Sequence, residues 1–188
     1  MRSLFVSLFL LFTLNSFSQT LFDSIPLKDG VAYYEKIVDL NGSKDTLFNK
    51  AKLWVIDLVS EPRYAIKTDD KQSGTIIFHA NTKFDYPYQF IYKKKIETGQ
   101  EEGTTYFTMK IFLKDNKAKI VFTDIKIINT DLVSLNIEGF KKVREPINDE
   151  QKKDYFNLFS LFRNGLLILD KVQEVFITYM NKKAENDF

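Results

Sequence analysis

Apolar residues recur at helical spacing in one segment of the first third of the chain. Between residues 44 and 59 they stand three or four positions apart, which places them on one face of an α-helix. Ser43 can accept a hydrogen bond from the first free N–H groups, and Asp45 lies near the positive end of the helix dipole. Pro62 disfavours helix in the residue before it. The pattern predicts a helix over residues 44–59, after a strand over residues 31–40.

From residue 63 to residue 128 apolar positions alternate with polar ones, which is the period of a β-strand. The clearest turn in this region is Asp115-Asn116, because both residues tolerate a positive φ angle. A hairpin centred there pairs apolar residues on one face: Leu113 with Ala118, Ile111 with Ile120, and Met109 with Phe122. A shift of one residue would destroy this agreement, so the pattern predicts the register as well as the strands.

Aromatic side chains occupy every second position of one predicted strand, in the order Phe84, Tyr86, Tyr88, Phe90 and Tyr92. The aromatic row is either one face of the core or an exposed platform for a ligand. A hairpin with its loop at residues 96–103 would place Tyr88 opposite Ile111, on the same face as the best-sorted core strand. That register favours a core role for the row.

Two features of the same row favour the edge of the sheet. Tyrosine in place of phenylalanine at three positions suggests hydroxyl groups that reach water. Pro87 cannot donate a backbone hydrogen bond to a neighbouring strand. The alternative of an exposed platform therefore stays open, with Tyr86, Tyr88 and Tyr92 as its candidate binding residues.

Near the end of the chain apolar residues return to spacings of three and four, which predicts a helical segment over residues 149–183. Without interruption this helix would be about 50 Å long, which is longer than we expect for a domain of this size. We therefore expect a break near Asn164-Gly165. Residues 129–146 form a predicted connector, with room for a short strand near residues 135–137.

The first residues have the pattern of an export signal. Arg2 provides a positive start, residues 4–14 are almost entirely apolar, and small residues before Gln19 allow cleavage near Ser18. The apolar run has about 11 residues, whereas a membrane-spanning helix needs about 20. We expect residues 1–18 to be a signal peptide, with export to the periplasm or the extracellular space and no transmembrane segment. An uncleaved anchor is the alternative.

Composition narrows the classes of fold and function. Residues 19–188 are enough for a single domain with one sizeable core. The absence of cysteine excludes disulfides, thiolate metal sites and a cysteine nucleophile. A net charge of +2, with both signs interspersed, argues against a nucleic-acid partner, which would require a basic patch. The element order favours an α+β fold, a curved antiparallel sheet of about five strands with helices on one face.

A resemblance to a known family is carried by four stretches: Ile25–Val38, Ser43–Val55, Asp69–Ile77 and Ile111–Ile125. In this order they resemble an uncharacterised family of exported bacterial proteins, described as a domain of unknown function with a TATA-binding-protein-like fold. The resemblance covers residues 27–128 and implies a curved antiparallel sheet with helices on one face. It implies no catalytic residues, and the fold does not by itself imply DNA binding.

Few residues have the pattern of a catalytic or metal site. His79 is the only histidine, and its strand parity places it on the polar face, so we expect a surface residue instead of a ligand or base. Asp69-Asp70 is expected to form a turn instead of an acid–base pair. Trp54 is expected in the core. Lys93–Lys95 is expected to be a solvated strand end, with contact to a lipid headgroup or an acidic glycan as the alternative.

Export, the lack of a recognisable catalytic set and the aromatic row favour a non-catalytic binding or interaction module of the bacterial cell envelope. Its partner would be an unknown protein, peptide or glycan, and we expect no metal or cofactor, because no phosphate-binding loop or metal-ligand pattern occurs. The alternatives are a hydrolase with a carboxylate-based site and a purely structural envelope protein. A deep pocket with two carboxylates would favour the hydrolase, and an apolar patch near Tyr86–Tyr92 would favour binding.

Overall fold

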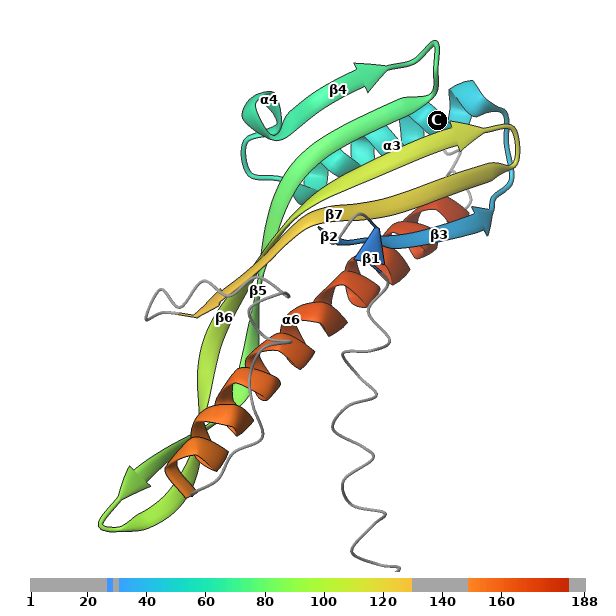
Figure 1. Ribbon diagram of the computed structural model, residues 1–188. Helices are drawn as coiled ribbons and strands as arrows, with labels where there is room; N and C mark the ends of the chain where they lie inside the picture. Colours follow the sequence, from blue (N-terminus) through green and yellow to red (C-terminus); the bar gives the residue numbers. More distant parts are fainter. Residues whose placement is uncertain (1–26, 29–30, 130–148, 183–188) are drawn as a thin grey trace, which may run out of the picture.

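The computed structural model describes residues 27–28, 31–129 and 149–182 (Figure 1). The predicted signal peptide at residues 1–18 lies outside the described residues. So does the predicted connector after Asn129, together with the short strand expected near residues 135–137. The division into a signal peptide and a single domain therefore stays a prediction.

The described strands form the expected antiparallel sheet, which is five-stranded, open and curved. Its strands, in spatial order, are β3 (Tyr34–Asp39), β7 (Lys117–Asn129), β6 (Lys95–Lys114), β5 (Thr75–Tyr92) and β4 (Ile66–Asp70). A second, two-residue pairing joins β1 (Leu27–Lys28) to β2 (Val31–Ala32). The strand predicted over residues 31–40 is thus divided between β2 and β3. The prediction of an α+β fold with a curved antiparallel sheet and helices is confirmed.

The predicted register between β6 and β7 is confirmed at all three pairs, for example at Met109 and Phe122. Asn116 has the positive φ angle, 58°, that a tight hairpin turn requires. The turn also supports the neighbouring helix, because the Asp115 carboxylate accepts a hydrogen bond from the Lys44 backbone N–H at 2.7 Å. The turn therefore joins the strand pair to the start of the helix.

Helix α3 (Lys44–Leu58) begins and ends where the apolar pattern places it, within one residue. The Ser43 hydroxyl accepts a hydrogen bond from the Thr46 N–H at 3.3 Å, which is the predicted N-cap. Trp54 is buried, as expected, and its ring meets Phe78 edge-on at 6.2 Å and Phe176 at 4.9 Å between centroids. Helix α3 is thus fixed both to the sheet and to the C-terminal helix.

The prediction that strand structure begins at residue 63 is wrong by three residues. Pro62–Ala65 form a single helical turn, α4, and β4 begins only at Ile66. Proline at the first helical position has the φ angle that a helix needs and lacks an N–H group that would stay unpaired there. This local preference outweighs the alternation of apolar residues.

Helix α6 (Asp149–Asn181) is continuous over 33 residues, so the break expected near Asn164-Gly165 is a wrong prediction. Gly165 is required for close packing, because a Cβ atom there would lie 2.8 Å from Ile127 side-chain atoms. The Thr105 hydroxyl donates a hydrogen bond to the Gly165 carbonyl at 2.9 Å. The glycine therefore lets the helix approach the sheet without interrupting it.

The core lies between one face of the sheet and the two long helices. Helix α6 packs against β5, β6, β7 and α3, and runs along the sheet (Figure 1). The buried residues of the core include Ile76, Phe78, Met109, Ile111, Ile120 and Phe122 from the sheet, and Leu161, Phe162, Leu169 and Phe176 from α6. Across residues 27–28, 31–129 and 149–182, we find no helix with the combination of length and apolar character that a bilayer crossing requires.

The register proposed for the aromatic row is wrong. Strand β5 continues to Tyr92 and β6 begins at Lys95, so the turn is Lys93-Lys94, with φ angles of 47° and 64°. Tyr88 consequently lies opposite Gly99, while Ile111 lies opposite Ile76. Lysine rarely adopts positive φ, so nothing in this dipeptide signals a hairpin turn.

Candidate functional site

A two-stranded arm extends from the five-stranded sheet. Among the described strands, β4 pairs with β5 only up to Phe78, and β7 pairs with β6 only from Gly103 onward. Residues 84–102 therefore continue as a hairpin of β5 and β6 alone, which we call the hairpin arm (Figure 1). The aromatic row lies on this arm.

The base of the arm is part of the core. Tyr86 is only 1% exposed, and Phe84 is also buried beside it, with 6.1 Å between the ring centroids. The Tyr86 hydroxyl donates a hydrogen bond to the Glu101 carboxylate on the opposite strand. Burial raises the pKa of Tyr86 well above its ordinary value, and the hydrogen bond to Glu101 raises it further. Tyr86 is therefore a structural residue, and its ring is not available to a partner.

The middle of the arm is attached to helix α6 by a pair of hydrogen bonds. The Asn157 side-chain oxygen accepts a hydrogen bond from the Gln89 backbone N–H at 2.6 Å, and its amide nitrogen donates to the Gln89 carbonyl at 2.9 Å. This arrangement satisfies the same two backbone groups that a neighbouring strand would satisfy. Tyr88, next to Gln89, is half-buried and packs against the core. The arm is thus held against helix α6 from its base as far as Gln89.

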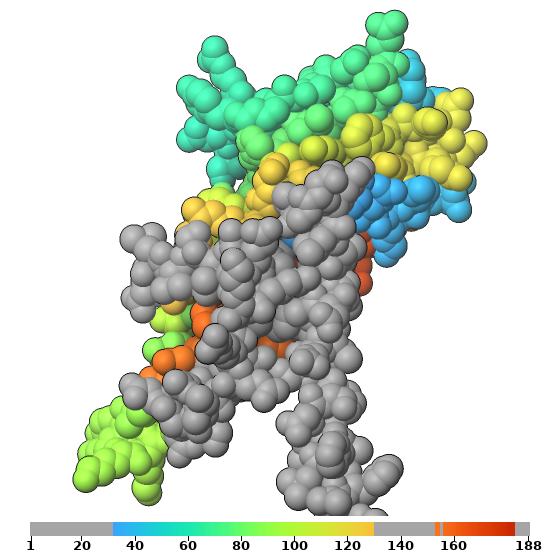
Figure 2. All heavy atoms as spheres, viewed as in Figure 1, coloured from blue at the N-terminus to red at the C-terminus, as the bar shows by residue number. Residues whose placement is uncertain are grey.

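Beyond Gln89 the arm exposes large apolar side chains. We define the arm tip as residues 90–96. Its exposed apolar residues are Phe90, Ile91, Tyr92 and Ile96, with exposed fractions of 40%, 55%, 55% and 50%. Figure 2 shows the tip projecting from the body of the molecule at the lower left.

The exposed side chains of the tip lie on both faces of the ribbon. Ile91 and Ile96 are direct partners in the register and therefore share one face. Phe90 and Tyr92 alternate with Ile91 and so lie on the opposite face. The tip therefore has no polar side of its own, unlike the half-exposed strands of an ordinary antiparallel sheet.

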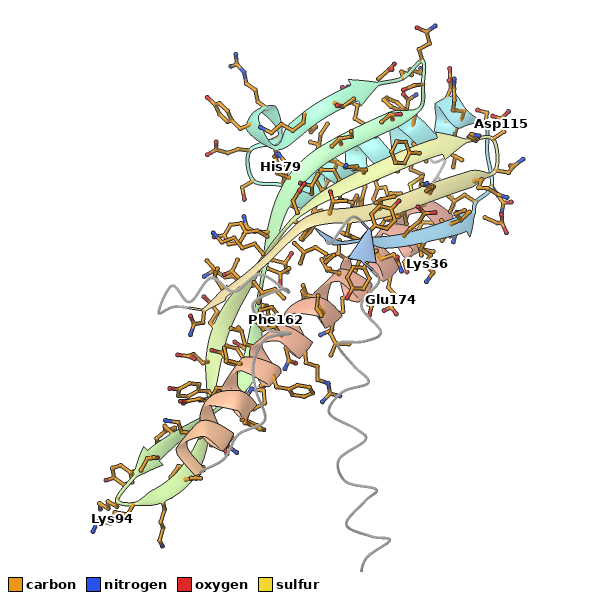
Figure 3. All side chains as sticks on the ribbon, in the orientation of Figure 1. Lys36, His79, Lys94, Asp115, Phe162 and Glu174 are labelled. Carbon is orange, nitrogen blue, oxygen red and sulfur yellow. The ribbon has the colours of Figure 1, made fainter. Side chains whose placement is uncertain are left out.

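The turn of the tip is cationic. Lys94 stands at the extreme end of the arm in Figure 3, between Lys93 and Lys95. The Lys93 ammonium lies 5.0 Å from the centroid of the Tyr92 ring, so its side chain turns back along the strand. Within the structurally described part of the chain none of the three lysines forms a salt bridge. The tip thus combines exposed apolar groups with three cations.

The three candidate binding residues from the sequence have different environments. Tyr86 is buried, Tyr88 is half-buried, and Tyr92 is exposed at the tip. Sequence reasoning missed Ile91 and Ile96, which become neighbours only once the turn is placed at residues 93–94. The available signal in the sequence was that these two isoleucines flank a short polar segment symmetrically, as the two partners of a hairpin do.

His79 lies on the surface, as expected, whereas Asp69 and Asp70 are the last residues of strand β4, and the turn begins after them at residue 71. His79 is exposed on β5, away from the arm (Figure 3), and its Nδ1 atom lies 2.8 Å from the Thr108 hydroxyl. The Asp70 carboxylate accepts hydrogen bonds from the backbone N–H groups of Gln72 and Ser73, and hydrogen bonds from Ser73 lower the pKa of Asp70. Asp69 pairs with Lys52. No three potential metal ligands come together in the ranges that the structure covers.

A hollow of about 360 Å³ lies on the sheet face opposite the core. Its lining residues are Ile37, Ser73, Phe112, Leu113, Lys114, Lys117 and Lys119. Two of its cations are already paired, Lys119 with Glu35 at 3.0 Å and Lys117 with Asp39 at 3.6 Å. No carboxylate belongs to the lining, so this hollow lacks the pair of acids that would favour a hydrolase.

Comparison with known proteins finds relatives in one family. A family model described as "Domain of unknown function (DUF4468) with TBP-like fold" matches residues 33–127. No curated protein matches the chain.

Two crystal structures share the fold. One is a DUF4468 family protein from Bacteroides ovatus, with a TM-score of 0.60, 12% sequence identity, and coverage of 87% of this chain and 94% of that chain. The other is a TBP-like protein from Parabacteroides distasonis, with a TM-score of 0.54, 15% identity, and coverage of 83% and 96%. At these identities the likeness concerns the fold alone.

Proposed function

Since the chain belongs to the DUF4468 family of domains of unknown function with a TBP-like fold, we propose, from its arm and its first residues, that it is an exported, non-catalytic interaction module of the bacterial cell envelope. The arm tip makes the contact with its partner. The signal-like pattern of residues 1–18 supports export. This proposal keeps Tyr92 as a binding residue and assigns Tyr86 to the core.

The observation that carries the proposal is the exposure of four large apolar side chains in seven consecutive residues. Single exposed apolar residues are ordinary on protein surfaces, but a contiguous exposed cluster indicates an interaction site. The cluster lies at the end of an arm whose base is buried and whose middle is attached to α6. An arm that is ordered before binding loses less conformational entropy when it binds.

The test is sedimentation of the exported chain with cell envelopes isolated from a bacterium that expresses it. The variant Ile91→Thr/Ile96→Thr keeps β-branched residues, and so the strand preference, while it removes apolar surface from the tip. We expect the bound fraction to fall by about tenfold, since each lost methylene contributes up to about 0.8 kcal/mol when buried.

The matched control is Ile37→Thr/Val175→Thr, which removes two side chains that are each 57% exposed and lie away from the tip. This control should bind as the unchanged chain does. Equal binding of the tip variant and the unchanged chain would contradict the proposed function, as would an unchanged chain that stays in the supernatant.

A further inference from the structure

The two-sided apolar surface of the tip restricts the kind of partner. A protein groove or a flat glycan surface covers one face of a β-ribbon and leaves the other in water. Here Ile91 and Ile96 point to one side, and Phe90 and Tyr92 to the other. A medium that surrounds the tip would remove all four side chains from water at once, and the interfacial layer of a lipid bilayer is such a medium. Tyrosine is also enriched at that layer, where its ring is buried and its hydroxyl stays wet.

The charge of the arm changes sign along its length. The end of the arm has the cations Lys93, Lys94 and Lys95, and along β6 acidic residues begin only at Glu97. Glu101 and Glu102 follow further from the tip. An anionic surface attracts the cationic end and repels the acidic part. The charge distribution therefore directs the arm end-on toward an anionic layer.

The dimensions of the tip fit a shallow position in that layer. From Phe90 to Lys93 the strand rises about 10 Å, which is comparable to the roughly 5–10 Å depth of interfacial elements in the headgroup region. Lysine side chains in such positions turn back so that the ammonium stays at the level of the phosphates. Lys93 already turns back, with its ammonium over the Tyr92 ring. Glu97 would mark the level at which the arm leaves the layer.

We propose that the arm tip, residues 90–96, docks into the headgroup layer of an anionic phospholipid bilayer. This inference rests on the proposed function and names the partner of the same tip. The three lysines at the end of the arm pair with lipid phosphates, and the isoleucine and tyrosine side chains directly behind them lie within the headgroup layer. The helix-bound base of the arm stays outside the bilayer.

The experiment is co-flotation of the exported chain with vesicles of phosphatidylethanolamine and phosphatidylglycerol, compared with vesicles of phosphatidylcholine alone. We expect binding to the anionic vesicles only. The variant Lys93→Gln/Lys94→Gln/Lys95→Gln should bind on the order of 100-fold more weakly, because each lysine near an anionic surface contributes about fivefold. The Ile91→Thr/Ile96→Thr variant should lose about tenfold or more.

Two matched controls separate a tip effect from a general loss of charge or apolar surface. Lys36→Gln/Lys126→Gln/Lys171→Gln removes three exposed cations away from the tip, and Ile37→Thr/Val175→Thr removes two exposed apolar groups. Both should float as the unchanged chain does. The variant Tyr92→Trp adds a fluorescent reporter at the tip, while the native Trp54 is buried in the core. Its emission should shift to shorter wavelength with anionic vesicles.

Three outcomes would overturn the lipid partner. They are absence of flotation, equal flotation with both vesicle types, and no change in the Tyr92→Trp emission. If tip-dependent sedimentation with cell envelopes persists in any of these cases, the partner is a protein or glycan and the proposed function stands. If sedimentation with envelopes is also independent of the tip, the proposed function fails together with the lipid partner.

Discussion

At the residue scale, glycines make room for the aromatic rings of the arm. Gly103 lies opposite Phe84 in the register. A Cβ atom at Gly103 would lie 2.5 Å from the Phe84 ring and 2.9 Å from a Leu161 methyl carbon. Gly99 is less confined, since a Cβ atom there would lie 3.4 Å from one Phe90 ring atom. The base of the arm thus depends on one small residue, whereas the outer part tolerates a larger one.

Substitution of Gly103 tests this packing. We expect Gly103→Ala to lower the free energy of unfolding by about 1–3 kcal/mol, because the added methyl group displaces a buried ring. For a chain of this size the melting temperature would fall by roughly 2–4 °C for each kcal/mol. Gly99→Ala is the control and should melt close to the unchanged chain. Equal melting temperatures for both variants would contradict the packing described for Phe84.

The half-buried Tyr34 predicts how stability depends on alkaline pH. Burial, and to a smaller extent the Asp170 carboxylate, raises the pKa of Tyr34 from its ordinary value of 10.0 to about 12. The unfolded chain therefore loses this proton first. The stabilising effect is complete below about pH 10 and is lost as the pH rises toward 12. Denaturant midpoints over this window should fall less steeply for Tyr34→Phe than for the unchanged chain.

The control for this prediction is Tyr64→Phe, which changes a tyrosine that is 70% exposed. Its denaturant midpoints should follow those of the unchanged chain across the same pH range. Tyr34→Phe curves that coincide with the control would show that the Tyr34 hydroxyl ionises in the folded chain as it does in water.

The environments of the three candidate tyrosines illustrate what alternation alone can predict. Tyr86, Tyr88 and Tyr92 have the same parity, and so they lie on the same face of one strand. Their burial decreases along the strand because α6 covers the base of the arm and not its end. The period of two predicts on which face of the strand each residue lies. It does not predict how much of that face α6 covers, because this depends on the tertiary structure.

At the element scale, Asn157 is the residue that attaches the arm to α6. We expect Asn157→Ala to increase hydrogen exchange at the Gln89 amide, because that N–H loses its acceptor. The amides of the central sheet should keep their protection. Asn164→Ala is the matched control, since the Asn164 amide bonds the Ser160 carbonyl within the same helix. Unchanged exchange at Gln89 would indicate that other contacts hold the arm.

The β5–β6 and β6–β7 hairpins differ in how well their sequences specify the turn. Asp115-Asn116 has side chains that favour positive φ, and the flanking apolar residues allow one register, so the register between β6 and β7 was predicted correctly. Lys93-Lys94 also forms a two-residue turn, with positive φ at both positions, without such side chains. The loop predicted at residues 96–103 is strand instead, and the two glycines in it, Gly99 and Gly103, accommodate aromatic rings. The prediction from local turn residues therefore failed at Lys93-Lys94, because tertiary packing determines the position of that turn.

At the scale of the whole molecule, the length of α6 and the length of the arm are linked. We expected a break in the helix because a helix of about 50 Å is longer than a rounded domain of this size. The structure is elongated instead, and α6 continues along the arm as far as Asn157 and beyond (Figure 1). The fold class and the position of α3 could be predicted from residue patterns. The elongation depends on contacts between residues that are 60 or more positions apart in the sequence.

In the proposed function, the tip of the helix-supported arm makes the contact with the cell envelope. The most direct measurement mixes the unchanged chain and Ile91→Thr/Ile96→Thr in equal amounts, with distinguishable labels, and sediments both with the same envelopes. The unchanged chain should be enriched in the pellet by about tenfold, while an equal mixture with Ile37→Thr/Val175→Thr should stay equal. A tip variant that sediments in equal amount with the unchanged chain would contradict the claim.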